Sequence, residues 1–195
     1  MKAYRLFTEQ EARELAASVT DWEPGKASND TTVTKCNDES KAGADRVTER
    51  LLGSAIPKLH FVQEISPPKF NRYRNGGEYG PHSDSSQMHG VRSDLACTLF
   101  LSDGYEGGEL CVMGHEVKLA PGEVMVYECW RPHYVKPVTK GERVAAIWWM
   151  SSYIRSEEQR DLLGMLRSVI GETKDEQHFA KLGAVHEKLV KIFWR

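Results

Sequence analysis

Residues 70–84 read FNRYRNGGEYGPHSD, and this stretch makes the most specific structural prediction in the chain. Two alternating segments flank Asn75-Gly76-Gly77, a pattern typical of strands separated by a turn. In an extended segment, residues i and i+2 share a face and lie about 7 Å apart. His82 and Asp84 can therefore converge on one ion, with one neutral and one anionic ligand. The His-x-Asp pattern alone is weak, so its surroundings decide the interpretation.

Further strand-like segments follow at short intervals and are separated by glycine-containing turns. Each is a continuous apolar run or alternates between apolar and polar residues. They cover residues 95–101, 109–113, 117–119, 124–127, 133–138 and 143–149. Many short strands at regular spacing predict a β-sandwich or barrel.

Two residues, one in each of the last two segments, complete a candidate site. His133 follows Asp84, and Arg143 follows His133. Two imidazoles and one carboxylate can occupy one face of octahedral Fe(II) and leave three positions open. A buried arginine suits the far carboxylate of a dicarboxylate co-substrate, because guanidinium binds carboxylates in a bidentate manner. We expect antiparallel pairing across the turn at residues 139–142 to keep His133 and Arg143 in one cavity.

The strand that begins at Arg143 shows which neighbours this arginine has. By the two-residue period, Arg143, Ala145, Ile147 and Trp149 lie on one face. The small alanine leaves room for a ligand, and Trp149 can form a wall of the cavity. We expect the guanidinium to be buried and to need an anion.

An ordered set of motifs extends this pattern over about residues 68–162. The motifs are Asn71-Arg72-Tyr73, Tyr79-Gly80-Pro81-His82-x-Asp84, Arg92-Ser93-Asp94-Leu95-x-x-Thr98-Leu99-Phe100-Leu101-Ser102-Asp103, Gly107-Gly108-Glu109-Leu110, Val117-Lys118-Leu119-x-x-Gly122 and His133-x-Val135-x-Pro137-Val138-Thr139-x-Gly141-x-Arg143-Val144-Ala145. Together they resemble the bacterial PKHD-type hydroxylases, which belong to the prolyl 4-hydroxylase group of 2-oxoglutarate oxygenases. The set is far more specific than the His-x-Asp motif.

The resemblance implies a mainly β fold with flanking helices, whose core is a double-stranded β-helix, or jelly roll. It also implies roles for particular residues. His82, Asp84 and His133 match the Fe(2+) ligands, and Arg143 matches the residue that binds the far carboxylate of 2-oxoglutarate. Tyr73 matches a tyrosine that hydrogen-bonds this co-substrate. Thr98 is a candidate for a hydroxyl contact, because the neighbouring Phe100 stands where some relatives have tyrosine.

The activity implied by the resemblance is hydroxylation of an organic substrate, either a prolyl residue in a peptide or a small metabolite. O2 is the oxidant, 2-oxoglutarate is decarboxylated to succinate and CO2, and L-ascorbate is a further cofactor to consider. One alternative is a cupin-like metal-binding protein without oxygenase chemistry, which would not require Arg143. A nucleic-acid demethylase of the same class is disfavoured, because position 149, where such enzymes carry a second arginine, is tryptophan.

Composition favours a soluble cytoplasmic protein, and leaves its oligomeric state open; the small-molecule or peptide substrate is what the resemblance implies. The formal charge of −2 and the pI near 6.4 do not predict binding to nucleic acid. The N-terminal residues lack an apolar run of the length of a signal peptide or membrane span. The four cysteines show no Cys-x-x-Cys spacing and are interpreted as free thiols in a reducing compartment.

The flanks of the strand region are predicted to be helical within a single domain. We expect an N-terminal helical flank at 1–60, a jelly-roll core at 68–153 and C-terminal helices at 156–195, packed on the outside of the strands. Thr8 with Glu11, Ser156 with Gln159, and Thr173 with Glu176 are candidate helix caps. A further helix is expected at 41–54, and a loop at 25–40.

Overall fold

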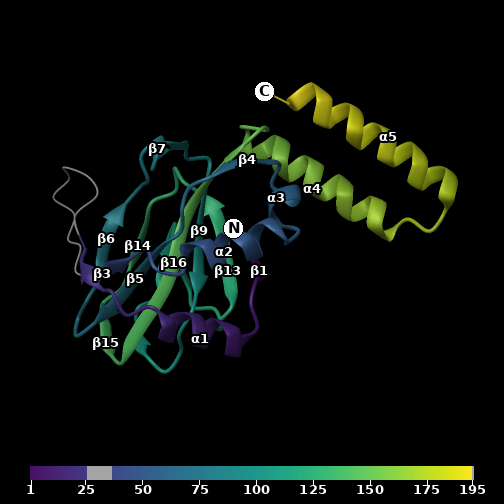
Figure 1. The fold of residues 1–195 in the computed structure, drawn as a ribbon. Helices are drawn as coiled ribbons and strands as arrows, with labels where there is room; N and C mark the ends of the chain where they lie inside the picture. Colours follow the sequence, from purple (N-terminus) through teal and green to yellow (C-terminus); the bar gives the residue numbers. More distant parts are fainter. Residues whose placement is uncertain (26–36, 195) are drawn as a thin grey trace.

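The computed structural model describes residues 1–25 and 37–194 (Figure 1). Most of the loop expected at 25–40 lies outside the described residues. Residues 38–40 differ from the expected loop, because they form strand β3 (Asp38–Ser40), which pairs with β2 (Glu23–Pro24) just before the loop. Within the described ranges, no helix combines the length and apolar character needed to cross a membrane.

Two sheets form the body of the fold. The larger one has eight antiparallel strands, and β16 is at its centre, paired with β9 on one side and with β5 and β4 on the other. Its strands, in spatial order, are β1 (Lys2–Arg5), β13 (Glu123–Glu128), β9 (Leu95–Phe100), β16 (Glu142–Ser152), β5 (Lys69–Arg74), β3 and β2, with β4 (Val62–Ile65) also on β16.

The smaller sheet has four strands and contains both candidate histidine ligands. In order these are β12 (His115–Val117), β11 (Leu110–Val112), β14 (His133–Val135) and β6 (Tyr79–His82). Two short ribbons complete the strands: β10 (Glu106–Gly107) with β15 (Val138–Lys140), and β7 (Gln87–Met88) with β8 (Val91–Arg92). The predicted mainly β architecture is confirmed, and its sheets are those of a jelly-roll core.

One expected strand pairing is wrong. His133 and Arg143 do not lie on paired strands, because β14 joins the smaller sheet and β16 the larger one. The chain changes sheet between them through β15, which pairs with β10. Local sequence does not specify this crossover, since it depends on partners far away in the chain. The two side chains still reach one cavity, from opposite walls.

The two faces of the larger sheet bury different sets of side chains. On β16, Val144, Ala146, Trp148 and Met150 face outward into a core shared with the N-terminal helices. Arg143, Ala145, Ile147 and Trp149 alternate with them and face the smaller sheet, as the two-residue period predicts. The inner face therefore supplies the cavity, while the outer face supplies most of the apolar packing.

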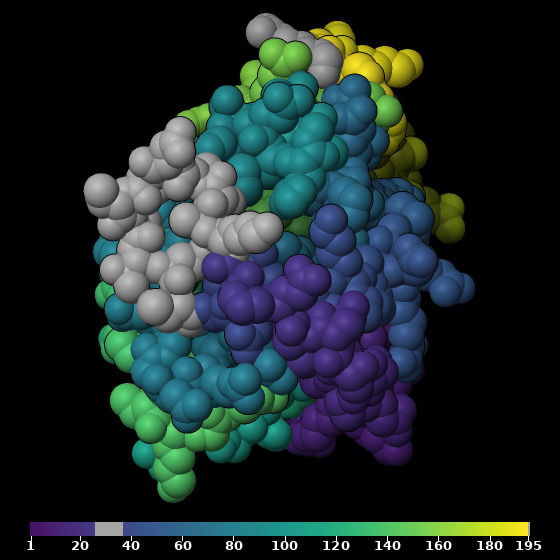
Figure 2. Space-filling view, turned by 60° about the vertical axis from the view of Figure 1, so that its left-hand side comes forward, coloured from purple at the N-terminus to yellow at the C-terminus, as the bar shows by residue number. Residues whose placement is uncertain are grey.

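The N-terminal flank contains the predicted helices and also three strands of the larger sheet. Helices α1 (Glu9–Ser18), α2 (Ala44–Leu52) and the short α3 (Ile56–Leu59) lie on its outer face. The capping box of Thr8 and Glu11 is confirmed. The purple N-terminal segment and the blue segment that contains α2 adjoin on the surface in Figure 2. Arg50 on α2 pairs with Glu11 on α1.

The C-terminal helices differ from the expectation in position and in one cap. Helices α4 (Glu157–Glu172) and α5 (Glu176–Phe193) pack against each other and extend away from the sheets (Figure 1). The Ser156 cap is confirmed, but α5 is capped by Asp175, while Thr173 ends α4. Within α4 only Arg160 and Leu163 are buried. The hairpin therefore contacts the body through the start of α4, and also through α5, where His186 is buried and stacks on Phe61 with ring centroids 6.5 Å apart.

Candidate active site

The cavity between the two sheets gathers the six residues selected from the sequence. Its lining includes His82, Asp84 and His133 on the side of the smaller sheet, and Tyr73, Thr98 and Arg143 on the larger sheet. Leu110, Val135, Ile147 and Trp149 add apolar walls. A polar cavity with such walls, enclosed by rigid strands, is the usual form of a small-molecule site.

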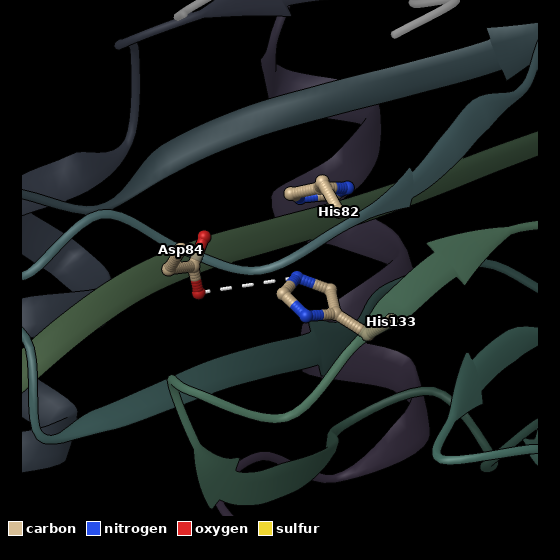
Figure 3. A group of neighbouring side chains, drawn as sticks. All are labelled: His82, Asp84 and His133. Atoms are coloured by element: carbon tan, nitrogen blue, oxygen red, sulfur yellow. Dashed lines mark ion pairs between the residues drawn. The ribbon is translucent and has the colours of Figure 1, made fainter. Parts of the chain in front are cut away.

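Antiparallel pairing brings the two histidines together. His133, the first residue of β14, is the register partner of His82, the last residue of β6. Their ring centroids lie 4.3 Å apart. Asp84 follows two residues after His82 and points toward His133, with 3.9 Å between Oδ2 and Nε2 (Figure 3). One donor atom from each of the three residues lies within 4.8 Å of the others, which is compatible with shared coordination of an ion.

Backbone carbonyls orient both imidazoles. The Nδ1 atom of His82 lies 2.9 Å from the carbonyl oxygen of Gly80, and Nδ1 of His133 lies 2.9 Å from that of Arg131. A carbonyl oxygen can only accept, so each Nδ1 carries the proton and each Nε2 carries the lone pair. Outer hydrogen bonds of this kind fix the tautomer and ring orientation of metal-binding histidines.

Burial shifts the pKa of the carboxyl group and of the second imidazole in opposite directions. Desolvation lowers the pKa of His133, with a smaller opposing effect from the Arg131 carbonyl. Desolvation also raises the pKa of Asp84, and the nearby Trp149 and His82 side chains oppose this increase. Among the described residues, Oδ2 of Asp84 has no hydrogen-bond partner. A divalent cation would offset the cost of burying this carboxylate.

Arg143 is buried on the opposite wall, with only 2% of its surface exposed. Its guanidinium carbon lies 5.3 Å from the ring centroids of both Tyr73 and Phe100. In the described part of the chain, neither Nε nor Nη2 finds a hydrogen-bond partner. Because a buried charge without an anion is costly, these donors fit a carboxylate placed within the cavity.

A glycine makes room for the arginine side chain. A Cβ atom at position 108 would lie 3.0 Å from Cδ of Arg143 and 2.8 Å from Cγ2 of Val138. Gly108 also has φ +67°, a backbone conformation that favours glycine. The Gly107-Gly108 motif is therefore part of the wall behind Arg143.

Tyr105 lies near Arg143, outside the residues that line the cavity, and the sequence interpretation gave it no role. It is 5% exposed, its hydroxyl has no hydrogen-bond partner among the described residues, and its ring lies beside Gly108. Burial raises the pKa of Tyr105, and nearby Arg143 opposes this increase. Residues 102–108 were interpreted only as a turn, and no strand alternation there indicated which way the Tyr105 side chain points.

Three further residues around the cavity were given little or no role from the sequence. Tyr79 stacks on His82 with ring centroids 3.9 Å apart, and Tyr127 meets His133 edge-on at 5.1 Å. Asn71 is buried and accepts a hydrogen bond from the Asn37 side chain at 3.1 Å. Alternation on β5 places Asn71 on the same face as Tyr73, and this was the available signal.

Comparisons with known proteins agree with this site. The family model described as the 2OG-Fe(II) oxygenase superfamily matches residues 68–151. A PKHD-type hydroxylase from Acidovorax ebreus is 33% identical, over 98% of this chain and 97% of its own length. One from Parvibaculum lavamentivorans is 36% identical, over 74% of this chain and 69% of its own. One from Maricaulis maris is 42% identical over 66% of this chain and 65% of its own length.

Solved structures support the fold. A prolyl-4-hydroxylase from Pseudomonas putida has a TM-score of 0.58 at 18% identity, covering 77% of this chain and 91% of its own. A Trichoplax adhaerens prolyl hydroxylase, in complex with a fragment of the hypoxia inducible factor oxygen degradation domain, gives 0.57 at 18% identity, covering 83% and 86%. With the full-length match to a relative above 30% identity, these findings show that the chain belongs to the PKHD-type hydroxylases of the 2OG-Fe(II) oxygenase superfamily and is a 2-oxoglutarate-dependent dioxygenase.

Proposed function

We propose that His82, Asp84 and His133 hold Fe(2+) as a facial triad. The observation that carries this proposal is the convergence of three donor atoms within 4.8 Å, with Arg143 on the opposite wall of the same cavity. Two neutral imidazoles and one carboxylate leave the bound ion with a net positive charge. Such a site attracts an anionic co-substrate and keeps three coordination positions available.

The second part of the proposal assigns 2-oxoglutarate to the space between the triad and Arg143. The unpartnered Nε and Nη2 donors of Arg143 would bind the far carboxylate. Tyr73 lies opposite Arg143 in the β5–β16 pairing, and Thr98 lies opposite Ile147 on the next strand. Their hydroxyl groups line the cavity and would donate to the same co-substrate.

The reaction we infer is hydroxylation of an organic substrate. When bound, iron supplies the dioxygen chemistry that couples decarboxylation of 2-oxoglutarate, to succinate and CO2, with transfer of one oxygen atom to the substrate. Arg143 orients the co-substrate, and the two backbone-bonded imidazoles keep their ligating nitrogens directed at one point. The apolar groups of Leu110, Val135 and Trp149 limit access of water to that point.

The substrate we propose is a prolyl residue in a peptide or a small metabolite. The names of two structural neighbours, both prolyl hydroxylases, support the first choice by analogy. We also propose L-ascorbate as the reductant that keeps iron in the ferrous state, and the cytoplasm as the compartment. The buried thiols Cys97, Cys111 and Cys129 are consistent with a reducing compartment. A cupin-like protein without oxygenase chemistry is not supported by the family membership.

Anaerobic titration tests the co-substrate assignment before any substrate is known. Adding Fe(II) and then 2-oxoglutarate to the full chain should produce a visible charge-transfer band, and His82→Ala should abolish it. Incubation with O2 and a library of peptides and metabolites should then yield succinate and a product heavier by one oxygen atom. Iron binding without the band or succinate would contradict the oxygenase proposal and favour a non-oxidative metal protein.

A further inference from the structure

The turn formed by residues 128–131, which we call the 128–131 turn, contacts both halves of the candidate triad. The backbone N–H of Asp84 donates to the carbonyl oxygen of Cys129 at 3.2 Å. The carbonyl oxygen of Arg131 lies 2.9 Å from Nδ1 of His133. Ser83, between His82 and Asp84, donates its hydroxyl to the carbonyl oxygen of Trp130 at 3.1 Å. A shift of this turn would therefore move Asp84 and His133 relative to each other.

The start of helix α4 contacts the first and the last residue of the 128–131 turn. Arg160 on α4 donates from Nη2 to Oε2 of Glu128 at 2.5 Å, with side chains only 5% and 12% exposed. Glu157, one helical turn earlier, pairs with Arg131, and both of these side chains are 23% exposed. Arg160 also donates to the carbonyl oxygens of Ile154 and Arg155, which fixes its guanidinium.

These contacts suggest a role for the start of the C-terminal hairpin, which lies beyond the residues matched by the family model. We propose that the first turn of α4 positions the metal ligands: Arg160 and Glu157 fix the 128–131 turn, and the turn fixes Asp84 and His133. This inference rests on the proposed metal site. Arg160 and Glu157 touch neither metal nor substrate, so they are positioning residues.

Burial makes the Arg160–Glu128 pair costly to break. An exposed ion pair contributes little to stability, whereas breaking a buried pair leaves an uncompensated charge and displaces the groups around it. Loss of Arg160 would leave Glu128 buried without its guanidinium partner, and the turn would have to move toward water. Loss of groups that orient metal ligands typically weakens metal affinity roughly 10–100-fold. Because Arg160 acts one contact further out, we expect about tenfold, the lower end of that range.

The test uses Co(II) as a spectroscopic substitute for the native ion and the full chain in each case. Arg160→Gln and Glu157→Gln should weaken Co(II) binding, measured by visible absorption, with the larger effect at Arg160. In the metal-free protein, the backbone amide of Asp84 should exchange with solvent faster in both variants. Asp38→Asn is the matched control, because the Arg72–Asp38 pair is similarly exposed, at 16% and 25%, and neither residue contacts the turn. This control should change neither measurement.

A charge exchange separates positioning from general destabilisation. Glu157→Arg combined with Arg131→Glu should restore Co(II) affinity lost in either single variant, because the pair is re-formed in reverse. Unchanged affinity and unchanged Asp84 exchange in both Gln variants would overturn the positioning role. If Arg160→Gln does not fold, Co(II) affinity and Asp84 exchange in Glu157→Gln and in the charge-exchange variant test the positioning role. Failure of the unmodified protein to bind Co(II), or binding unaffected by His82→Ala, would instead overturn the metal site itself.

Discussion

His133 lies directly opposite His82 in the antiparallel pairing of β14 with β6, and their rings are 4.3 Å apart. This pairing makes the candidate metal site a property of the smaller sheet rather than of a flexible loop. Register between two strands is strongly specified where side chains are buried. We therefore expect the two imidazoles to be held close together before any ion binds.

Replacement of single ligands should test this arrangement most directly. His82→Ala, Asp84→Ala and His133→Ala should each weaken Fe(II) or Co(II) binding by more than the roughly 10–100-fold typical of outer-shell changes, because a donor atom itself is lost. Isothermal titration under anaerobic conditions measures the affinity. His115→Ala is a suitable control, because His115 is exposed on β12 of the same sheet. A normal affinity in any of the three ligand variants would contradict its assignment.

Arg143→Met should separate co-substrate binding from metal binding. Removing one partner of a buried, hydrogen-bonded charge pair costs roughly 3–5 kcal/mol, so 2-oxoglutarate should bind at least about 100-fold more weakly. The affinity for Co(II) should stay the same. The metal-free variant should be as stable as the unmodified protein or more stable, because a buried guanidinium with unpartnered donors has been removed. Equal 2-oxoglutarate affinity in both proteins would show that another residue binds the far carboxylate.

Features of the site that depend on residues close together in sequence were predictable, and features that depend on distant residues were not. The face shared by Arg143, Ala145, Ile147 and Trp149 was predictable, because strand alternation is local. The capping box at Thr8 was predictable for the same reason. The placement of β14 and β16 in different sheets was not, since it depends on β11 and β6 pairing with β14. The family resemblance still predicted that His133 and Arg143 share a cavity, although the expected pairing of their strands was wrong.

The helices at the C-terminus show a second limit of sequence patterns. An apolar stripe predicts that a helix packs against something, but not against which partner. Helices α4 and α5 contact each other, while Leu162, Phe179 and Val185 remain about half exposed and Met165 is 69% exposed. The buried Arg160, which links α4 to the sheet, is a charged residue within an amphipathic helix. Such residues are usually exposed, so nothing in the sequence pattern distinguished it.

His60 should make stability depend on pH in the mildly acidic range. Burial lowers its pKa from 6.5 to about 4, and Tyr4 Oη lies 2.8 Å from its Nε2. Between these pH values the unfolded chain binds a proton that the folded protein does not, so the free energy of unfolding falls as pH decreases. This difference between the unfolded and folded pKa of His60 corresponds to a loss of roughly 3 kcal/mol in the free energy of unfolding. Urea unfolding at pH 7, 6, 5 and 4 should show a shallower decrease for His60→Gln, and parallel curves would contradict the assignment.

Tyr105→Phe should reveal whether the residue missed in the sequence belongs to the co-substrate site. Its hydroxyl has no hydrogen-bond partner within the described structure, so removing the oxygen should not lower the free energy of unfolding. If the hydroxyl donates to the carboxylate beside Arg143, 2-oxoglutarate affinity should fall by roughly 2–10-fold, equivalent to one hydrogen bond of about 0.5–1.5 kcal/mol. Co(II) affinity should not change. Thr98→Val is the parallel test for the hydroxyl chosen from the resemblance, and a larger loss in Tyr105→Phe would identify Tyr105 as the main hydroxyl contact.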